Sequence, residues 1–260
     1  MGHPPKKSRP HGVSKQKLSN VTPFLVLAVY PISYLLGFSF NPIEFLWTAD
    51  LARQGRPIGE PMPQELQDRA DTVTRYLNFF VDALIVSSIA IWAHKISLSP
   101  ARLGLHLTDW KRYVLVGVTA GILLVSIQGL LVRRVPIDPL HAFTYAVRKG
   151  SLLVWVSIFI SSAFSEELWI ASCLIVLRPA THSAAISVTI TIVVFAAMHY
   201  SYRFWGAVAV AVKGSVSAIL FLHFGSLIVT FFCHFVANLG SLYWNRYWRP
   251  RRVADLSPTV

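Results

Sequence analysis

The sequence predicts an all-α membrane protein, a polytopic transmembrane bundle of about seven to eight helices. Hydrophobic residues make up 54% of the 260 residues and charged residues only 14%, whereas soluble domains carry about 25% charged residues. The apolar residues gather in runs of about 20, the length at which a helix crosses the hydrocarbon core of a bilayer. Polar, proline-rich or basic stretches separate these runs, and we find neither an internal repeat nor a separate soluble domain.

The positive charge indicates contact with lipid headgroups rather than with nucleic acid. The formal net charge is +12, but the basic residues lie mostly in the N-terminal tail and in short connections between apolar runs. This placement is typical of anchoring at the membrane interface and of attraction to anionic lipid. We therefore expect the lipid bilayer as a partner, with anionic lipid bound through the basic tails, and no nucleic acid.

The chain divides into a basic tail (residues 1–20), one transmembrane domain (residues 21–248) and a short C-terminal tail (residues 249–260). We expect the first tail to be disordered. It does not resemble a cleaved signal peptide, because the apolar run after it is long and lacks a small-residue cleavage site. Cys173 and Cys233 lie in apolar runs without metal-type spacing, which favours small buried hydrophobic residues over a disulfide.

The first half of the chain contains three predicted spans. The first, residues 21–40, should be kinked at Pro31, which removes a helix hydrogen bond. A polar connection follows (residues 41–75), whose last part we interpret as a surface helix at residues 64–75. The second and third spans are residues 76–93 and 113–132. After them, prolines mark a loop that holds a short interfacial helix at residues 141–149.

The second half contains four predicted spans, at residues 151–177, 183–199, 204–222 and 225–244. The first of them should stop at Arg178-Pro179, because a residue before proline is pushed out of helical geometry. The span at residues 204–222 should be interrupted at Lys213-Gly214. Seven spans place the two basic termini on opposite sides of the membrane, so the positive-inside rule does not decide the topology. An eighth span, or a re-entrant segment near Lys213-Gly214, would reconcile the ends.

The chemistry centres on Glu166 and Glu167, two adjacent acids inside the fourth span. A charged side chain at that depth costs about 2.5–3.5 kcal/mol on insertion scales, so an acid in a membrane helix is by default a functional-site hypothesis. Glu167 is turned by about 100° from a polar helix face that contains Glu166. That face, which should point to the bundle interior or to a wet cavity, comprises Ser162, Ser165, Glu166, Trp169 and Ser172. The alternative is a structural ion pair with a basic residue.

Two later spans carry groups that could complete a hydrolytic site. His199 ends the fifth span, and we expect that helix to extend past Tyr200. His234 and Asn238, four residues apart in the seventh span, share one helix face. A carboxylate with a neighbouring histidine can deprotonate a water, and an Asn and a second His can donate to the oxyanion of a peptide carbonyl. Taken singly, each group also fits an interfacial residue or a hydrogen bond between packed helices.

Together these residues resemble the CPBP family of intramembrane glutamic endopeptidases. The family includes the type II CAAX prenyl endopeptidases and the bacteriocin-processing or immunity (Abi) relatives. Its three ordered motifs correspond to Glu166-Glu167, Phe195-x-x-x-His199 and His234-x-x-x-Asn238. The resemblance covers residues 152–243, the protease-like core, and the Ala-Arg-Leu-Gly-Leu segment at residues 101–105 is similar to one that often precedes that core.

The resemblance implies a metal-independent endopeptidase that cuts a membrane-anchored or lipid-modified protein or peptide. Glu166 would activate the water with help from His199. His234 and Asn238 would stabilise the oxyanion, Glu167 would support them, and Phe195 would be a packing residue. No cofactor, no metal and no serine or cysteine nucleophile is implied. We expect a multi-pass protein of the prokaryotic cell (inner) membrane.

One position departs from the family pattern. The first motif usually reads Glu-Glu-x-x-x-Arg, and Ala171 stands at the arginine position. Arg178 lies on nearly the same helix face as Glu167 but about 16 Å further along, at 1.5 Å per residue. Arg203 or Lys213 would have to fold back to replace the missing cation. This departure favours a second hypothesis, a catalytically impaired member that binds a membrane partner or acts as an immunity protein.

Two further functions fit the sequence less well. A zinc protease could use the same acid and histidines, but the chain has no His-Glu-x-x-His helix, the signature of such a site. A transporter with a proton-relay glutamate would also place an acid in a membrane helix. Transporters of that kind are commonly built from two repeated halves, and this chain shows no such repeat.

Overall fold

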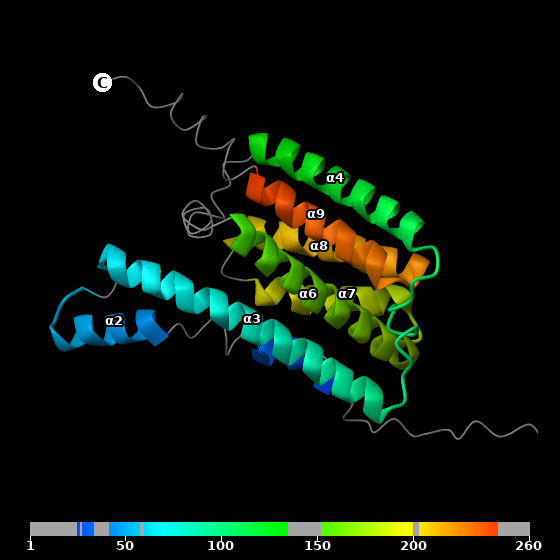
Figure 1. Cartoon of the computed structure of the whole chain (residues 1–260), viewed down its shortest axis with the longest axis horizontal. Coiled ribbons are helices and arrows are strands. Elements are labelled where there is room, and N and C mark those ends of the chain that lie inside the picture. The colour runs from blue at the N-terminus through cyan, green and yellow to red at the C-terminus, as the bar shows by residue number, and fades with distance from the viewer. Residues whose placement is uncertain are drawn as a thin grey trace, which may run out of the picture.

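The computed structural model describes the chain at residues 25–26, 28–33, 42–57, 60–134, 152–199 and 203–243. Within these ranges the regular structure is entirely helical, as Figure 1 shows, and the predicted all-α class is confirmed. Both terminal tails, most of the first predicted span and the predicted interfacial helix at residues 141–149 lie outside the described residues.

The helices agree with a membrane bundle. Within the described ranges, α3, α4, α6 and α8 are long and apolar enough to cross a membrane, whereas α7 and α9 are apolar but shorter. In chain order the helices are α2 (Pro42–Arg53), α3 (Gln64–Lys95), α4 (Trp110–Arg134), α6 (Leu152–Thr181), α7 (Ala184–Met198), α8 (Arg203–Phe224) and α9 (Leu227–Tyr243).

Helix α3 is continuous from Gln64 to Lys95, so the predicted surface helix at residues 64–75 and the predicted span at residues 76–93 are one element. No Gly or Pro interrupts its 32 residues. Its polar start is stabilised by side-chain pairs one turn apart, including Arg69 with Glu65 at 2.7 Å. The polar connection before it also contains α2, which the sequence did not lead us to expect. Pro42 opens α2, at a position where a missing N–H costs no helix bond.

The predicted ends of two helices were wrong. Helix α6 continues through Arg178-Pro179 to Thr181, because a proline in the last turn removes only one intrahelical bond. His182, in the left-handed region at φ 53°, follows the helix. Helix α7 ends at Met198 rather than past Tyr200. His199 is its C-cap, and the backbone N–H of His199 donates to the Ala196 carbonyl.

Helix α8 runs unbroken through Lys213-Gly214, where we predicted an interruption. The glycine serves close packing against α7. A Cβ at Gly214 would lie 3.0 Å from both Ile192 Cδ1 and Phe195 Cδ1. The missing side chain therefore brings the backbone of α8 close to α7, and the re-entrant segment considered at this place is absent.

Helix α6 is the centre of the bundle. It packs against α3, α7, α8 and α9, and Figure 1 shows α3 along one edge of the bundle and α4 along the opposite edge. In the apolar stretch of α6, 67% of the residues are buried, compared with 28% or less in the other three candidate spans. The helix that carries the two acids is thus the one that the other helices surround.

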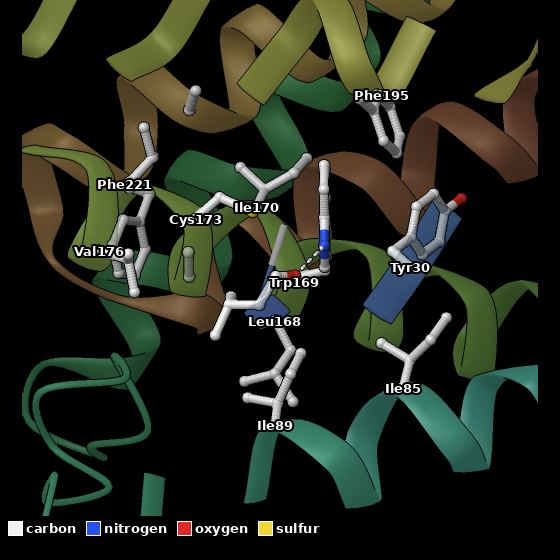
Figure 2. Close-up of a cluster of buried hydrophobic side chains, with 14 of the residues drawn as sticks. Tyr30, Ile85, Ile89, Leu168, Trp169, Ile170, Cys173, Val176, Phe195 and Phe221 are labelled. Atoms are coloured by element: carbon white, nitrogen blue, oxygen red, sulfur yellow. Dashed lines mark hydrogen bonds between the residues drawn. The ribbon is translucent and has the colours of Figure 1, made fainter. Parts of the chain in front are cut away.

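An aromatic cluster holds α6 to the N-terminal segment and to α7. The Trp169 ring centroid lies 5.1 Å from that of Tyr30 and 6.3 Å from that of Phe195. The Trp169 indole also donates to the Val26 carbonyl at 3.0 Å, and Figure 2 shows these rings within the buried cluster. The free cysteines Cys173 and Cys233 are likewise buried, as predicted.

Helices α4 and α9 approach each other at glycines. A Cβ at Gly117 would lie 2.4 Å from the Val229 carbonyl oxygen, and one at Gly121 would lie 2.7 Å from that of Cys233. These two glycines are four residues apart and so form a small-xxx-small face of the kind that lets membrane helices pack backbone to backbone. The contact places α4 directly behind the helix that carries His234.

The loop between α3 and α4 is tied to the tight turn between α8 and α9. Gly104 has φ +81°, and its carbonyl accepts from the Leu227 backbone N–H at 3.0 Å. Nε2 of His106 lies 3.1 Å from the Gly225 carbonyl oxygen. A Cβ at Gly104 would approach Leu227 N at 2.8 Å. The Ala-Arg-Leu-Gly-Leu segment at residues 101–105 therefore supports the start of α9.

Candidate active site

The α8–α9 hairpin brings two pairs of polar side chains face to face. The two helices are joined by a short turn at Gly225, so residues equally far from the turn lie opposite each other in the antiparallel pair. Ser217 and His234 are about two turns of helix from Gly225, and Lys213 and Asn238 are one turn further. Both members of each pair therefore point toward the same part of the bundle.

Glu167 is deeply buried between these helices. Its side chain is 1% exposed, and its Oε1 accepts from Ser217 Oγ at 2.8 Å and from His234 Nδ1 at 2.7 Å. One carboxylate oxygen thus joins α6, α8 and α9. The supporting role that we assigned to Glu167 stays a prediction.

Glu166 is the more accessible acid, with 12% of its side chain exposed, and it carries fewer contacts. Its Oε2 lies 3.3 Å from Nε2 of His234. That oxygen is buried and has no hydrogen-bond partner within the described ranges of the chain. A buried carboxylate oxygen without a donor is costly, and it is well suited to accept a proton from a water or a substrate.

His199 is held in one orientation at the end of α7. Its Nδ1 donates to the Phe195 carbonyl at 2.8 Å, and its ring packs against the Phe195 ring at 4.8 Å between centroids. The side chain is 4% exposed and experiences the charges of Glu166 and Lys213. Because Nδ1 carries the proton, Nε2 of the neutral ring is an acceptor.

Lys213 enters the site from α8. Its Nζ lies 2.7 Å from Nε2 of His234 and 3.3 Å from Oδ1 of Asn238. Lys213 is one of the two cations that we considered as replacements for the missing motif arginine, and its side chain reaches the site. Ala171 itself is fully buried, and the Arg203 side chain lies outside the described side chains.

The structure therefore gathers four of the five predicted site residues in one contact network. Glu166, Glu167 and His234 touch directly, and Asn238 joins them through Lys213. His199 stands at the end of α7, electrostatically linked to Glu166. Within the described ranges, no cluster of three His, Cys, Asp or Glu side chains has the arrangement of a metal site.

The first part of the polar face of α6 points to the bundle interior, one of the two surroundings that we predicted for it. At its N-terminal end, Ser161 and Ser165 each donate to Asp82 of α3 at 2.5 Å, and Ser162 donates to it at 3.3 Å. Ser165 is fully buried and Asp82 nearly so. That part of the face is a seam between two packed helices, which ends at Ser165, directly before Glu166.

Sequence reasoning missed Asp82 and Ser217, although each had a signal. Asp82 is a lone acid in an apolar run, the same feature that drew attention to Glu166. Ser217 lies four residues after Lys213, so the two side chains share one face of α8. A polar face on α8 would have pointed to this helix as a further wall of the site.

The comparison with family models gave a match that covers the candidate site. Residues 148–240 match the family model described as "Rce1-like: Type II CAAX prenyl endopeptidase Rce1-like". Neither the curated proteins nor the solved structures gave a match. The matched residues include both acids, both histidines, Asn238 and Lys213. The matched part of the chain, residues 148–240, holds the whole candidate site and is similar to the Rce1-like type II CAAX prenyl endopeptidases.

Proposed function

We propose that the protein is an intramembrane glutamic endopeptidase that hydrolyses a peptide bond of a membrane-anchored or lipid-modified protein. One observation carries this proposal. Glu166 has a buried carboxylate oxygen without a hydrogen-bond donor in the described part of the chain, 3.3 Å from an imidazole nitrogen. Oε2 of Glu167 also lacks a donor, but that side chain is 1% exposed whereas Glu166 is 12% exposed, so Glu166 is the acid that a water can reach. An accessible acid at a costly depth, in a region similar to membrane proteases, is best explained by a proton that it must accept.

The reaction needs one water and no covalent enzyme intermediate. Glu166 accepts a proton from the water, and the water oxygen bonds to the peptide carbonyl carbon to form a tetrahedral oxyanion. The C–N bond then breaks, and the proton passes to the leaving nitrogen, which gives a carboxylic acid and an amine. His199, whose Nε2 is an acceptor, helps to hold and deprotonate the water. General-base assistance of this kind contributes about 10²–10⁴-fold.

The substrate class follows from the family and from the bilayer. A site on helices that cross the membrane meets substrates confined to that membrane, and the matched family is described by its prenylated C-terminal substrates. We infer that a lipid-modified or membrane-anchored segment delivers the scissile bond to Glu166. The prokaryotic inner membrane and contact of the basic tails with anionic lipid remain part of this proposal.

The test compares Glu166→Gln and His199→Ala with wild type in proteoliposomes. The probe is a farnesylated peptide ending in a Cys-aliphatic-aliphatic-X sequence, and products are identified by mass spectrometry. Gln keeps the shape of Glu166 but cannot accept the proton, so we expect product formation to fall by at least about 10²-fold. Glu65→Gln is the matched control, since Glu65 is 81% exposed on α3.

A second experiment looks for native substrates and so does not depend on the farnesylated peptide. New protein termini in membranes that contain wild type are compared with those in membranes that contain the Glu166→Gln variant. Termini that depend on Glu166 identify the substrate. Cleavage that persists at the wild-type rate in the Glu166→Gln or His199→Ala variant, with normal insertion, would rule out the proposed chemistry.

A catalytically impaired member that binds a membrane partner or confers immunity is the second candidate. The observation that favours it is Ala171, fully buried where the family motif usually has arginine. Under this alternative, Glu166→Gln would leave the cellular effect of the protein intact. Partner binding would instead be lost through changes on the exposed helix faces.

A further inference from the structure

We propose that Lys213 is a catalytic residue, whose ammonium group donates the hydrogen bond that stabilises the oxyanion. Asn238 supplies the second donor, and His234 is a positioning residue rather than an oxyanion donor. This inference deepens the proposed function and rests on it. It reassigns the role that the motif alone suggested for His234.

The contacts of His234 decide which nitrogen carries its proton. Nδ1 lies 2.7 Å from Oε1 of Glu167, an acceptor, so Nδ1 must be the N–H. Nε2 lies 2.7 Å from Nζ of Lys213. An ammonium has donors and no acceptor, so the lysine must be the donor in this contact. Nε2 therefore accepts and cannot donate to an oxyanion.

The same tautomer explains the contact of His234 with Glu166. Nε2 and Oε2 of Glu166 are 3.3 Å apart, yet that oxygen has no hydrogen bond within the described ranges. Two acceptors facing each other make no bond. Glu166 thus keeps its lone pair for a water, while Lys213 holds the other side of the same nitrogen.

Lys213 has one donor to spare. An ammonium carries three N–H groups, and the described contacts use two of them, toward His234 Nε2 and Asn238 Oδ1. Both acceptors are uncharged, so these two contacts do not pair the lysine with a carboxylate. A third N–H and a full positive charge remain for the developing oxyanion, the group that such a charge stabilises best.

Asn238 is oriented by the same lysine. Because its Oδ1 accepts from Nζ, its Nδ2 is left as a donor on the other branch of the amide. Lys213 therefore keeps Nε2 of His234 as an acceptor and fixes the direction of the Asn238 amide. One cation, one amide and one acid then surround the same place, near the middle of α6 and of α8 and in the second half of α9.

The position of Lys213 near α7 adds a link to His199. Its neighbour Gly214 brings α8 within contact of Phe195, one turn before His199. The charge of Lys213 accordingly acts on the His199 ring as well as on His234. The oxyanion donor would thus face the water held by Glu166 and His199 across the scissile carbonyl.

The experiment measures kcat and KM for the farnesylated peptide with two Lys213 variants. Lys213→Met keeps the length of the side chain and removes the donor and charge. We expect kcat to fall by about 10²–10³-fold, the usual loss for one oxyanion donor, with KM changed less than about threefold because ground-state binding is not involved. Lys213→Arg keeps a donor and should recover at least about tenfold over the methionine variant. Lys95→Met, exposed in the last turn of α3, is the control.

A second measurement needs no substrate. In protein labelled with ¹⁵N-histidine in lipid, solid-state NMR reports which ring nitrogen of His234 is protonated, with His234→Gln providing the assignment. We expect protonated Nδ1 and bare Nε2 at neutral pH. A protonated Nε2 in the wild type overturns the inference, whatever the activity of the Lys213→Met variant.

The outcomes separate this inference from the proposed function. If Glu166→Gln abolishes cleavage and Lys213→Met retains more than about half of wild-type kcat, Lys213 is no oxyanion donor while the function stands. If Glu166→Gln is fully active, the proposed function fails first. Loss in both variants with recovery in Lys213→Arg, together with the bare Nε2, supports the assignment.

Discussion

Glu166 and Glu167 are neighbours in the chain, yet their surroundings have little in common. The helix turns successive side chains by about 100°, which sends Glu167 between α8 and α9 and leaves Glu166 12% exposed. Glu167 accepts two hydrogen bonds on one oxygen, whereas Oε2 of Glu166 accepts none within the described ranges. Oε2 of Glu167 also lacks a donor within the described ranges, but its carboxylate is held through Oε1 and its side chain is only 1% exposed. Glu166, which is more accessible, is therefore the candidate base.

The hydrogen bond from Ser217 to Glu167 should matter for both stability and rate. Ser217→Ala removes a donor from a buried carboxylate, so we expect a loss of about 1–3 kcal/mol in the free energy of unfolding. The cleavage rate should fall as well, because Glu167 would hold His234 less firmly. Thermal unfolding in detergent and peptide cleavage measure the two effects.

Ser215→Ala is the matched control for this change. Ser215 lies on the same helix, and its hydroxyl donates only within α8, to the Ala211 carbonyl at 2.7 Å. Its removal should alter stability by less than about 0.5 kcal/mol. Equal effects of the two substitutions would show that Ser217 has no special connection to the site.

Among the helices, the α4–α9 pair depends on the absence of side chains. Gly117 and Gly121 let the backbones approach so closely that a Cβ at either place would overlap α9. Gly240 repeats this arrangement from α9, where a Cβ would lie 2.4 Å from Val125 Cγ2. Because α9 carries His234 and Asn238, the glycines of α4 influence the site without touching it.

Gly121→Val should separate α4 from α9 and lower both stability and activity. The new side chain would meet the Cys233 carbonyl and Val236, atoms that cannot move without shifting α9. Overpacking of this kind costs about 1–3 kcal/mol. Thr119→Val, on the exposed face of α4, adds an apolar side chain without meeting α9 and should leave the melting temperature and cleavage rate near wild type.

At the scale of the whole molecule, the matched family region meets the preceding part of the chain along one side of α6. The N-terminal segment contributes Tyr30 and the Val26 carbonyl to the Trp169 cluster. Helix α3 contributes Asp82, which accepts from Ser161 and Ser165 of α6, the second of them directly before Glu166. The residues outside the region from 148 to 240 therefore help to position the helix that carries the acids.

Asp82→Ala should weaken that connection. The change leaves Ser161 and Ser165 without the acceptor that they share, in a buried seam. Both hydroxyls keep a backbone carbonyl acceptor within α6, that of Ile158 or of Ser162. We therefore expect a loss of about 0.5–1.5 kcal/mol in unfolding free energy, the net worth of a hydrogen bond. The melting temperature of the protein in detergent checks this. Asp68→Ala, exposed in the polar start of α3, is the control, and equal melting temperatures for both variants would contradict the role of the seam.

The sequence by itself determined the helical membrane class, because long apolar runs with few charges have one stable arrangement in a bilayer. It also singled out Glu166, Glu167, His199, His234 and Asn238 as candidate site residues, since acids and paired polar groups in such runs are costly and therefore conspicuous. It misjudged the ends of α6 and α7 and the continuity of α3 and α8, because a local pattern does not show which turns are stabilised by packing.

Only the tertiary structure decided which partners these residues have. The contacts of Asp82 with α6, of Ser217 with Glu167 and of Lys213 with His234 join residues that are 21 to 83 positions apart. Such pairs depend on the register of packed helices, set here by the Gly225 turn and by glycine contacts, and no local periodicity encodes them. The position of the site cation on α8, rather than at Ala171 on α6, follows from that register.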